Sequence, residues 1–165
     1  MDFSLTKQQR DIKKAAAEFA HSEFLPDVAQ EHELNHRYPR ELFKKAAQLG
    51  FIGLDYPERI GGGGMGVIEN VLVIEEFCKA DSGLGMALHL GYVPSKIIKV
   101  VGTPQQQEKF LGPLVRGDSI SAIAMTEADH GSDLTRMATT LEEDKDGFVI
   151  NGAKLFTTNA SYADF

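Results

Sequence analysis

The sequence has one cysteine, no tryptophan and no apolar run long enough to cross a membrane. The single Cys78 excludes an internal disulfide framework and favours a reducing compartment, so we expect a cytoplasmic protein. The start, Met1–Thr6, lacks the basic end and apolar core of a signal peptide. We therefore predict a protein without a membrane span.

Basic residues are also few. Seventeen Lys and Arg against 24 Asp and Glu give a formal net charge of −7, and no basic run interrupts this balance. Sequence-independent binding to a nucleic-acid backbone needs a basic face, so we expect no nucleic-acid partner. A few local amides and cations can still hold one phosphate group of a small ligand.

The apolar spacing of the first two thirds of the chain is helical. Thr6 and Gln9 have the spacing of a capping box at the start of a first helix. Pro39 precedes a second helix, and Gly50 suits its carboxyl end. The apolar stripe predicted for this second helix consists of Leu42, Ala46 and Leu49.

Three further helical segments follow the glycine-rich loop at residues 61–66. The first of them is predicted to be central in the bundle. Its expected buried face consists of Val67, Val71, Ile74 and Cys78. The second spans residues 84–101 and is interrupted near Pro94. The third begins at Thr103–Gln106, where Pro104 occupies the first helical position.

Residues 119–165 have the alternation of strands instead. Ser119–Met125 alternates with period two, and Asp146-Gly147 is a hairpin turn between two short strands. Another strand is predicted over Lys154–Thr158. The fold class is therefore α+β: an N-terminal up-and-down α-helical domain at residues 1–118 and a truncated antiparallel β domain at 119–165.

The glycine-rich loop matches G-x-G-x-x-G at Gly61, Gly63 and Gly66. A dinucleotide site needs a strand before such a loop, and the preceding residues are broken by Gly53 and Pro57. The element after it is followed by another helix rather than by a second strand. We interpret the loop as a connection between helices, not as a phosphate cradle.

A second short match is H-E-x-x-H at His32, Glu33 and His36, the zinc signature of helical metallopeptidases. Pro39 ends any helix soon after His36, and no third ligand has suitable spacing. A solvated helix end is the preferred interpretation, with a zinc peptidase as an alternative. We predict no metal site.

A dense polar run, Ala124–Asp133, leaves the predicted strand. It combines hydroxyls, carboxylates and a glycine without apolar interruption. Such a loop can be a plain Asx-rich turn, or it can offer consecutive amides and hydroxyls to an anion. The residue types alone leave both interpretations open.

This run belongs to a larger pattern. Thr126-Glu127, Gly131-Ser132-Asp133, Ile150–Lys154 and Phe156–Asn159 together resemble the flavin-binding signature of acyl-CoA dehydrogenases. The earlier chain resembles the helical N-terminal domain of that family, in order, at Tyr38–Leu42, Leu49–Leu54, Pro57-Glu58, Gly61–Gly64, Gly102-Thr103, Gln107–Leu111 and Leu114–Asp118.

The resemblance implies an FAD enzyme that converts an acyl-CoA to a trans-2-enoyl-CoA, with a carboxylate removing the α-proton and flavin accepting the β-hydride. It also implies an electron-transfer flavoprotein as acceptor and a homotetramer. The cofactor-binding residues implied are Ile123, Ala124, Met125, Thr126, Gly131, Ser132, Phe156, Thr157 and Thr158. By the same resemblance, Ser132 also lies beside the acyl-CoA substrate.

Two residues depart from the family pattern, because Ala128 replaces a usual proline and His130 replaces a usual small residue. The family's catalytic base belongs to a C-terminal helical domain, so we expect it beyond Phe165 and assign no catalytic residue here. We expect the 165-residue chain to be inactive alone. The alternative function from another class is a non-catalytic helical interaction module.

Overall fold

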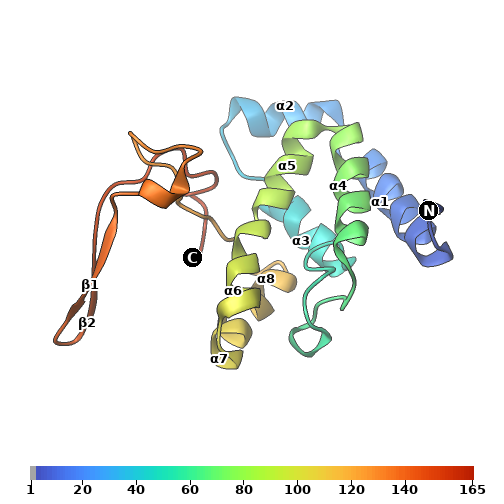
Figure 1. Ribbon diagram of the computed structural model, residues 1–165. Helices are drawn as coiled ribbons and strands as arrows, with labels where there is room; N and C mark the ends of the chain where they lie inside the picture. Colours follow the sequence, from blue (N-terminus) through green and yellow to red (C-terminus); the bar gives the residue numbers. More distant parts are fainter. Residues whose placement is uncertain (1–2) are drawn as a thin grey trace.

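The computed structural model describes residues 3–165, so the start compared with a signal peptide lies partly outside the described residues (Figure 1). Its helices form one compact group, and a β-hairpin extends away from them. The elements are α1 (Lys7–Glu23), α2 (Pro26–Leu34), α3 (Arg40–Gln48), η1 (Glu58–Ile60), α4 (Val67–Ala80), α5 (Ser82–Leu90), η2 (Val93–Ser95), α6 (Lys96–Val101), α7 (Pro104–Gln106), η3 (Gln107–Leu111), α8 (Gly112–Val115), η4 (Leu134–Arg136), β1 (Thr140–Asp144) and β2 (Gly147–Asn151).

The predicted helix starts and breaks are confirmed. At α1 the Gln9 amide donates to Thr6 Oγ1 at 3.2 Å and the Thr6 amide donates to Gln9 Oε1 at 2.9 Å. Thr103 and Gln106 form the same capping box at α7. Pro94 lies in the 3₁₀ turn η2, which separates α5 from α6. Local capping and proline chemistry therefore determine where these helices begin and end.

The core of the helical part is an aromatic cluster between α1, α4 and the segment after α3. Phe19, Phe24, Phe51 and Phe77 are all buried. Their ring centroids lie 5.3–5.8 Å apart, with edge-to-face and tilted orientations. These are favourable aromatic arrangements, and they hold α1 against α4.

The predicted faces of α3 and α4 need correction. Leu49 is 62% exposed because α3 ends at Gln48. On α4, Val67 and Val71 are exposed, Ile74 and Cys78 are only half-buried, and the buried positions are Asn70, Leu72, Val73 and Phe77. The central position of α4 is confirmed, because it packs between α1 and α5. Its true core face contains a polar residue, which an apolar pattern does not recognise.

The β part is confirmed as an antiparallel hairpin, with two differences in detail. The turn residues are Lys145 and Asp146, while Gly147 pairs with Asp144 as the first residue of β2. The predicted strands Ser119–Met125 and Lys154–Thr158 do not form, because within residues 3–165 neither segment has a continuous pairing partner. In the second segment Phe156 is left-handed and Thr158 lies in a turn. No helix among these residues is long and apolar enough to span a membrane.

Candidate functional site

The glycine-rich loop is a structural connection, as predicted. The amides of Gly62, Gly63, Gly64 and Met65 donate at 2.8–3.2 Å to carbonyls of residues 53–57. A Cβ on Gly62 would lie 2.3 Å from the Tyr56 carbonyl oxygen. These amides face the protein, so they are not available to a phosphate group.

The zinc geometry suggested by H-E-x-x-H does not form. Helix α2 ends at Leu34, and His36 lies beyond it with φ of 50°. His32 Nδ1 is 3.1 Å from the Arg37 carbonyl oxygen. Over residues 3–165, His, Cys, Asp and Glu side chains form no group of three that could hold a metal ion. The two imidazoles therefore do not share one helical face, which the zinc signature requires.

The polar run and the segment after β2 come together in space. The Leu155 amide donates to the Thr126 carbonyl oxygen at 2.8 Å, which joins two segments that are far apart in the sequence. Glu127 and His130 form a tight turn, in which each amide donates to the other residue's carbonyl, at 3.0 and 3.2 Å. Gly131 and Ser132 follow this turn directly.

This junction leaves polar groups free for a ligand. Within residues 3–165, no hydrogen bond is made by the hydroxyls of Thr126, Ser132 and Thr158 or by the amides of Gly131 and Ser132. No atom lies within 4 Å of where a Cβ on Gly131 would be. Free amides next to a hydroxyl are suited to an anion, so the second interpretation of the polar run is favoured.

The other residues implied by the resemblance surround this junction. Ile123 and Thr157 are half-buried, whereas Ala124 and Met125 are exposed. Phe156 is 89% exposed and adopts φ of 55°. A bulky residue in this left-handed conformation is uncommon and is typical of functional sites. Its exposed ring offers a flat apolar surface two residues before the free hydroxyl of Thr158.

Glu127 has a role that sequence reasoning missed. Its carboxylate is 7% exposed and accepts hydrogen bonds from the Ala138 amide, the Thr139 amide and hydroxyl, and Lys154 Nζ. The bonds from Lys154 and Thr139, then that from the Ala138 amide, hold the pKa of Glu127 well below its usual range. This carboxylate is therefore a fixed acceptor and is unsuited to act as a general base near neutral pH.

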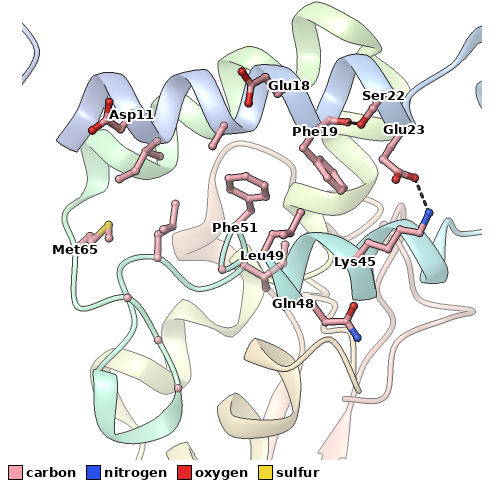
Figure 2. Close-up of a pocket in the computed structure, with 18 residues that line it drawn as sticks. Asp11, Glu18, Phe19, Ser22, Glu23, Lys45, Gln48, Leu49, Phe51 and Met65 are labelled. Carbon is pink, nitrogen blue, oxygen red and sulfur yellow. Dashed lines mark hydrogen bonds and ion pairs between the residues drawn. The ribbon is translucent and has the colours of Figure 1, made fainter. Parts of the chain in front are cut away.

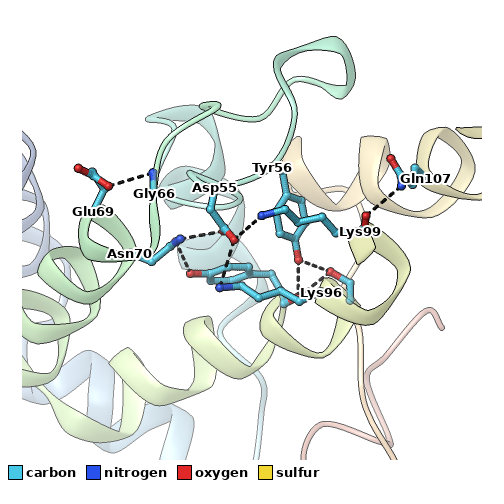
Figure 3. Close-up of polar contacts among 10 residues, drawn as sticks. Asp55, Tyr56, Gly66, Glu69, Asn70, Lys96, Lys99 and Gln107 are labelled. Atoms are coloured by element: carbon cyan, nitrogen blue, oxygen red, sulfur yellow. Dashed lines mark hydrogen bonds and ion pairs between the residues drawn. The ribbon is translucent and has the colours of Figure 1, made fainter. Parts of the chain in front are cut away.

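A second polar cluster, also missed, lies inside the helical part (Figure 3). Asp55 accepts from Asn70 Nδ2 at 2.7 Å and from Lys99 Nζ at 2.8 Å, with Lys96 Nζ 3.4 Å away. The Tyr92 hydroxyl donates to Asn70 Oδ1 at 2.9 Å. Every buried polar side chain in this group has a partner, so the cluster is a satisfied structural network.

A cleft of about 920 Å³ lies between α1, α3 and the glycine-rich loop (Figure 2). Phe19 and Phe51 contribute to its apolar lining. Asp11 and Glu18 lie at its edge, and the Lys45–Glu23 ion pair, at 2.7 Å, lies at one end. The cleft can bury an apolar group, and the hydroxyl in its lining, that of Ser22, already donates to the Phe19 carbonyl oxygen at 2.9 Å.

Two family models match successive parts of the chain. The family model for the acyl-CoA dehydrogenase N-terminal domain matches residues 6–118, and that for the acyl-CoA dehydrogenase middle domain matches residues 122–165. A helical N-terminal part followed by a β-hairpin is the corresponding fold. The chain belongs to the acyl-CoA dehydrogenase family.

Individual relatives cover the whole chain. It is 39% identical to benzylmalonyl-CoA dehydrogenase of Aromatoleum aromaticum over 100% of this chain and 44% of that protein. A chain solved in work on the electron transferring flavoprotein of Acidaminococcus fermentans is 37% identical with a TM-score of 0.89, over 99% of this chain and 43% of that one. An acyl-CoA dehydrogenase from Bacillus anthracis, solved with FAD, is 31% identical with a TM-score of 0.86, over 98% of this chain and 28% of that one. The chain spans less than half the length of these relatives.

Proposed function

We propose that this chain is part of an FAD-dependent acyl-CoA dehydrogenase, which converts an acyl-CoA thioester to a trans-2-enoyl-CoA. The observation that carries the proposal is the Leu155–Thr126 hydrogen bond, which joins the two halves of the flavin-binding signature. The free amides of Gly131 and Ser132 support it, because they suit a pyrophosphate. The FAD complex of the Bacillus anthracis relative supports the cofactor.

The residues present fit FAD in chemical type. Met125 and Thr126 would meet the edge of the isoalloxazine ring, and Gly131 and Ser132 the pyrophosphate. Phe156 would pack on the ring and Thr158 would donate to it, with Ile123, Ala124 and Thr157 completing the surroundings. When bound, FAD supplies the hydride acceptor that no amino-acid side chain provides.

We also propose a residue that contacts the substrate and a location for the catalytic base. Ser132 would lie beside the acyl-CoA as well as the pyrophosphate, so one hydroxyl would contact both ligands. We assign the α-proton acceptor to a segment beyond Phe165. The low pKa and full hydrogen bonding of Glu127 support this assignment, because they make that nearby carboxylate a poor base. The 165-residue chain alone is expected to show no dehydrogenation.

Four further features of the whole protein are also proposed: its domain division, its electron acceptor, its assembly and its cellular setting. The division at residues 1–118 and 119–165 is supported by the two family matches, at 6–118 and 122–165. An electron-transfer flavoprotein as acceptor is supported by the Acidaminococcus fermentans relative. We propose a homotetramer and a role in fatty acid or carboxylic acid degradation on the family resemblance, and a cytoplasmic location on the single cysteine.

Ser132→Ala in the full-length protein tests the proposal. We expect the dissociation constant for FAD, or the KM for acyl-CoA, to rise about tenfold or more, because a hydrogen bond to a charged group is lost. Ser161→Ala is the matched control, since Ser161 is an exposed serine outside the signature. If Ser132→Ala leaves both affinities unchanged, the role of Ser132 is wrong.

A second candidate function, the helical interaction module, is favoured by the apolar cleft between α1 and α3. The intact mass and absorption of the protein from its natural source separate the two candidates. A mass well above 18.1 kDa with bound flavin supports the dehydrogenase. A mass near 18.1 kDa without flavin supports the module.

A further inference from the structure

One partly buried ion pair lies at the meeting point of three segments of the proposed flavin site. Lys154 Nζ is 2.7 Å from Glu127 Oε1, and the two side chains are 20% and 7% exposed. Both residues belong to the flavin-binding signature, but neither is among the residues to which the resemblance assigns a cofactor contact. A carboxylate as buried as that of Glu127 is rarely found without a charged partner, so the position of this pair calls for an explanation.

Glu127 closes the loop that carries Gly131 and Ser132. The chain leaves at Glu127 and returns at Ala138 and Thr139, whose amides donate to the Glu127 carboxylate at 2.6 and 3.0 Å. The Thr139 hydroxyl adds a third bond at 2.5 Å. One carboxylate thus holds both ends of the loop together, and its bonds are strong because the acceptor is charged.

Lys154 joins this closed loop to the segment that carries Phe156. Besides Glu127, its Nζ donates to the Met125 carbonyl oxygen at 3.1 Å, while the next amide, Leu155, donates to the Thr126 carbonyl. The Met125 carbonyl and the Thr126 N–H belong to one planar peptide unit and point in opposite directions. Holding that carbonyl against Lys154 therefore turns the Thr126 N–H to the other side, where it forms no hydrogen bond within residues 3–165.

We propose that Glu127 and Lys154 are positioning residues of the flavin site, which fix the Met125–Thr126 peptide and the base of the Gly131–Ser132 loop relative to Phe156. This inference rests on the proposed function. The pair aligns donors that come from separate segments before the ligand binds. Binding then requires less ordering of the loop, which is the usual gain from preorganisation.

The test uses the full-length apoprotein, titrated with FAD and followed by flavin fluorescence and absorption. Glu127→Gln and Lys154→Met are each expected to raise the dissociation constant for FAD about tenfold, by loss of a charged hydrogen bond, and to shift the flavin absorption bands. Lys154→Arg keeps the charge and donors, so it should restore both readouts in part. Lys145→Met is the control, because Lys145 lies in the exposed hairpin turn.

The outcomes separate the two proposals. If the unaltered protein fails to bind FAD, the proposed function is wrong and the positioning role falls with it. If it binds FAD and both variants match it in affinity and absorption, only the positioning role is overturned. Should both variants fail to fold, Thr139→Val decides, since it removes one bond to Glu127 and keeps the ion pair. A weaker affinity, by about threefold, supports the role, and an unchanged affinity and spectrum overturn it.

Discussion

Asn70 donates a hydrogen bond of 2.7 Å from its side-chain amide to the carboxylate of Asp55, and both residues are buried. The bond ties α4 to the segment that supports the glycine-rich loop. Lys99, from α6, donates to the other carboxylate oxygen at 2.8 Å. One acidic side chain therefore connects three parts of the helical domain (Figure 3).

Asp55→Asn is expected to lower the free energy of unfolding of the chain by about 1–3 kcal/mol at pH 7, because a charged acceptor is removed from a buried network. Urea unfolding measures the change. Glu18→Gln is the matched control, since the Glu18 side chain is 68% exposed, and it should change stability by less than about 0.5 kcal/mol. Equal stabilities for Asp55→Asn and the control would show that the network contributes little.

The effect of Asp55 should also depend on pH. Burial raises its pKa, but hydrogen bonds from Lys99 and Asn70 and the charges of Lys96 and Lys99 outweigh burial and lower the pKa. A lowered folded-state pKa means that the stabilisation is present above the unfolded pKa, about 4, and is lost as the pH falls through the folded value. The stability difference between the unaltered chain and Asp55→Asn should therefore shrink below about pH 4.

Gly62→Ala tests the structural role of the glycine-rich loop. The added Cβ would lie 2.3 Å from the Tyr56 carbonyl oxygen, which is backbone and cannot move aside easily. We expect a loss of about 2 kcal/mol or more in the free energy of unfolding. Gly131→Ala, where no atom lies within 4 Å, should change it by less than about 0.5 kcal/mol. A stable Gly62→Ala protein with weakened FAD binding would instead favour the phosphate interpretation.

Ala128→Pro should stabilise the chain by about 0.4–1 kcal/mol, because proline reduces the entropy of the unfolded state. Ala128 is the second residue of the Glu127–His130 turn, a position that proline favours, and its amide makes no hydrogen bond within residues 3–165. Ala128→Gly should instead lower the stability of the chain, because glycine increases the entropy of the unfolded state. Thermal unfolding of the unaltered chain and the two variants gives their order of stability. Destabilisation by Ala128→Pro would mean that the backbone of this turn does not accommodate proline.

Phe156→Gly separates stability from binding. The residue is 89% exposed with φ of 55°, so glycine removes little packing and relieves a left-handed strain of about 1–2 kcal/mol. We expect the apoprotein to be at least as stable as the unaltered one in urea. The dissociation constant of the full-length protein for FAD should rise about tenfold, through lost ring contact. Phe148→Ala, on exposed β2, is the control and should leave FAD affinity unchanged.

The sequence alone predicts the features that depend on neighbouring residues. Helix starts at Thr6 and Thr103, the break at Pro94 and the hairpin around Asp146 are local, because capping, proline geometry and turn chemistry act within a few positions. The residue order of the flavin-binding signature also identifies the family. These features need no knowledge of how distant segments meet.

The tertiary structure decided what depends on contacts between distant residues. Asn70 lies on the core face of α4 only because Asp55 and Tyr92 satisfy its amide, so the apolar pattern pointed to the wrong face. The Glu127 carboxylate is a buried acceptor rather than an exposed acid only because Thr139 and Lys154, which are distant in the sequence, fold back and donate hydrogen bonds to it. A polar residue's role depends on its partners, and for these residues the partners are brought together by folding.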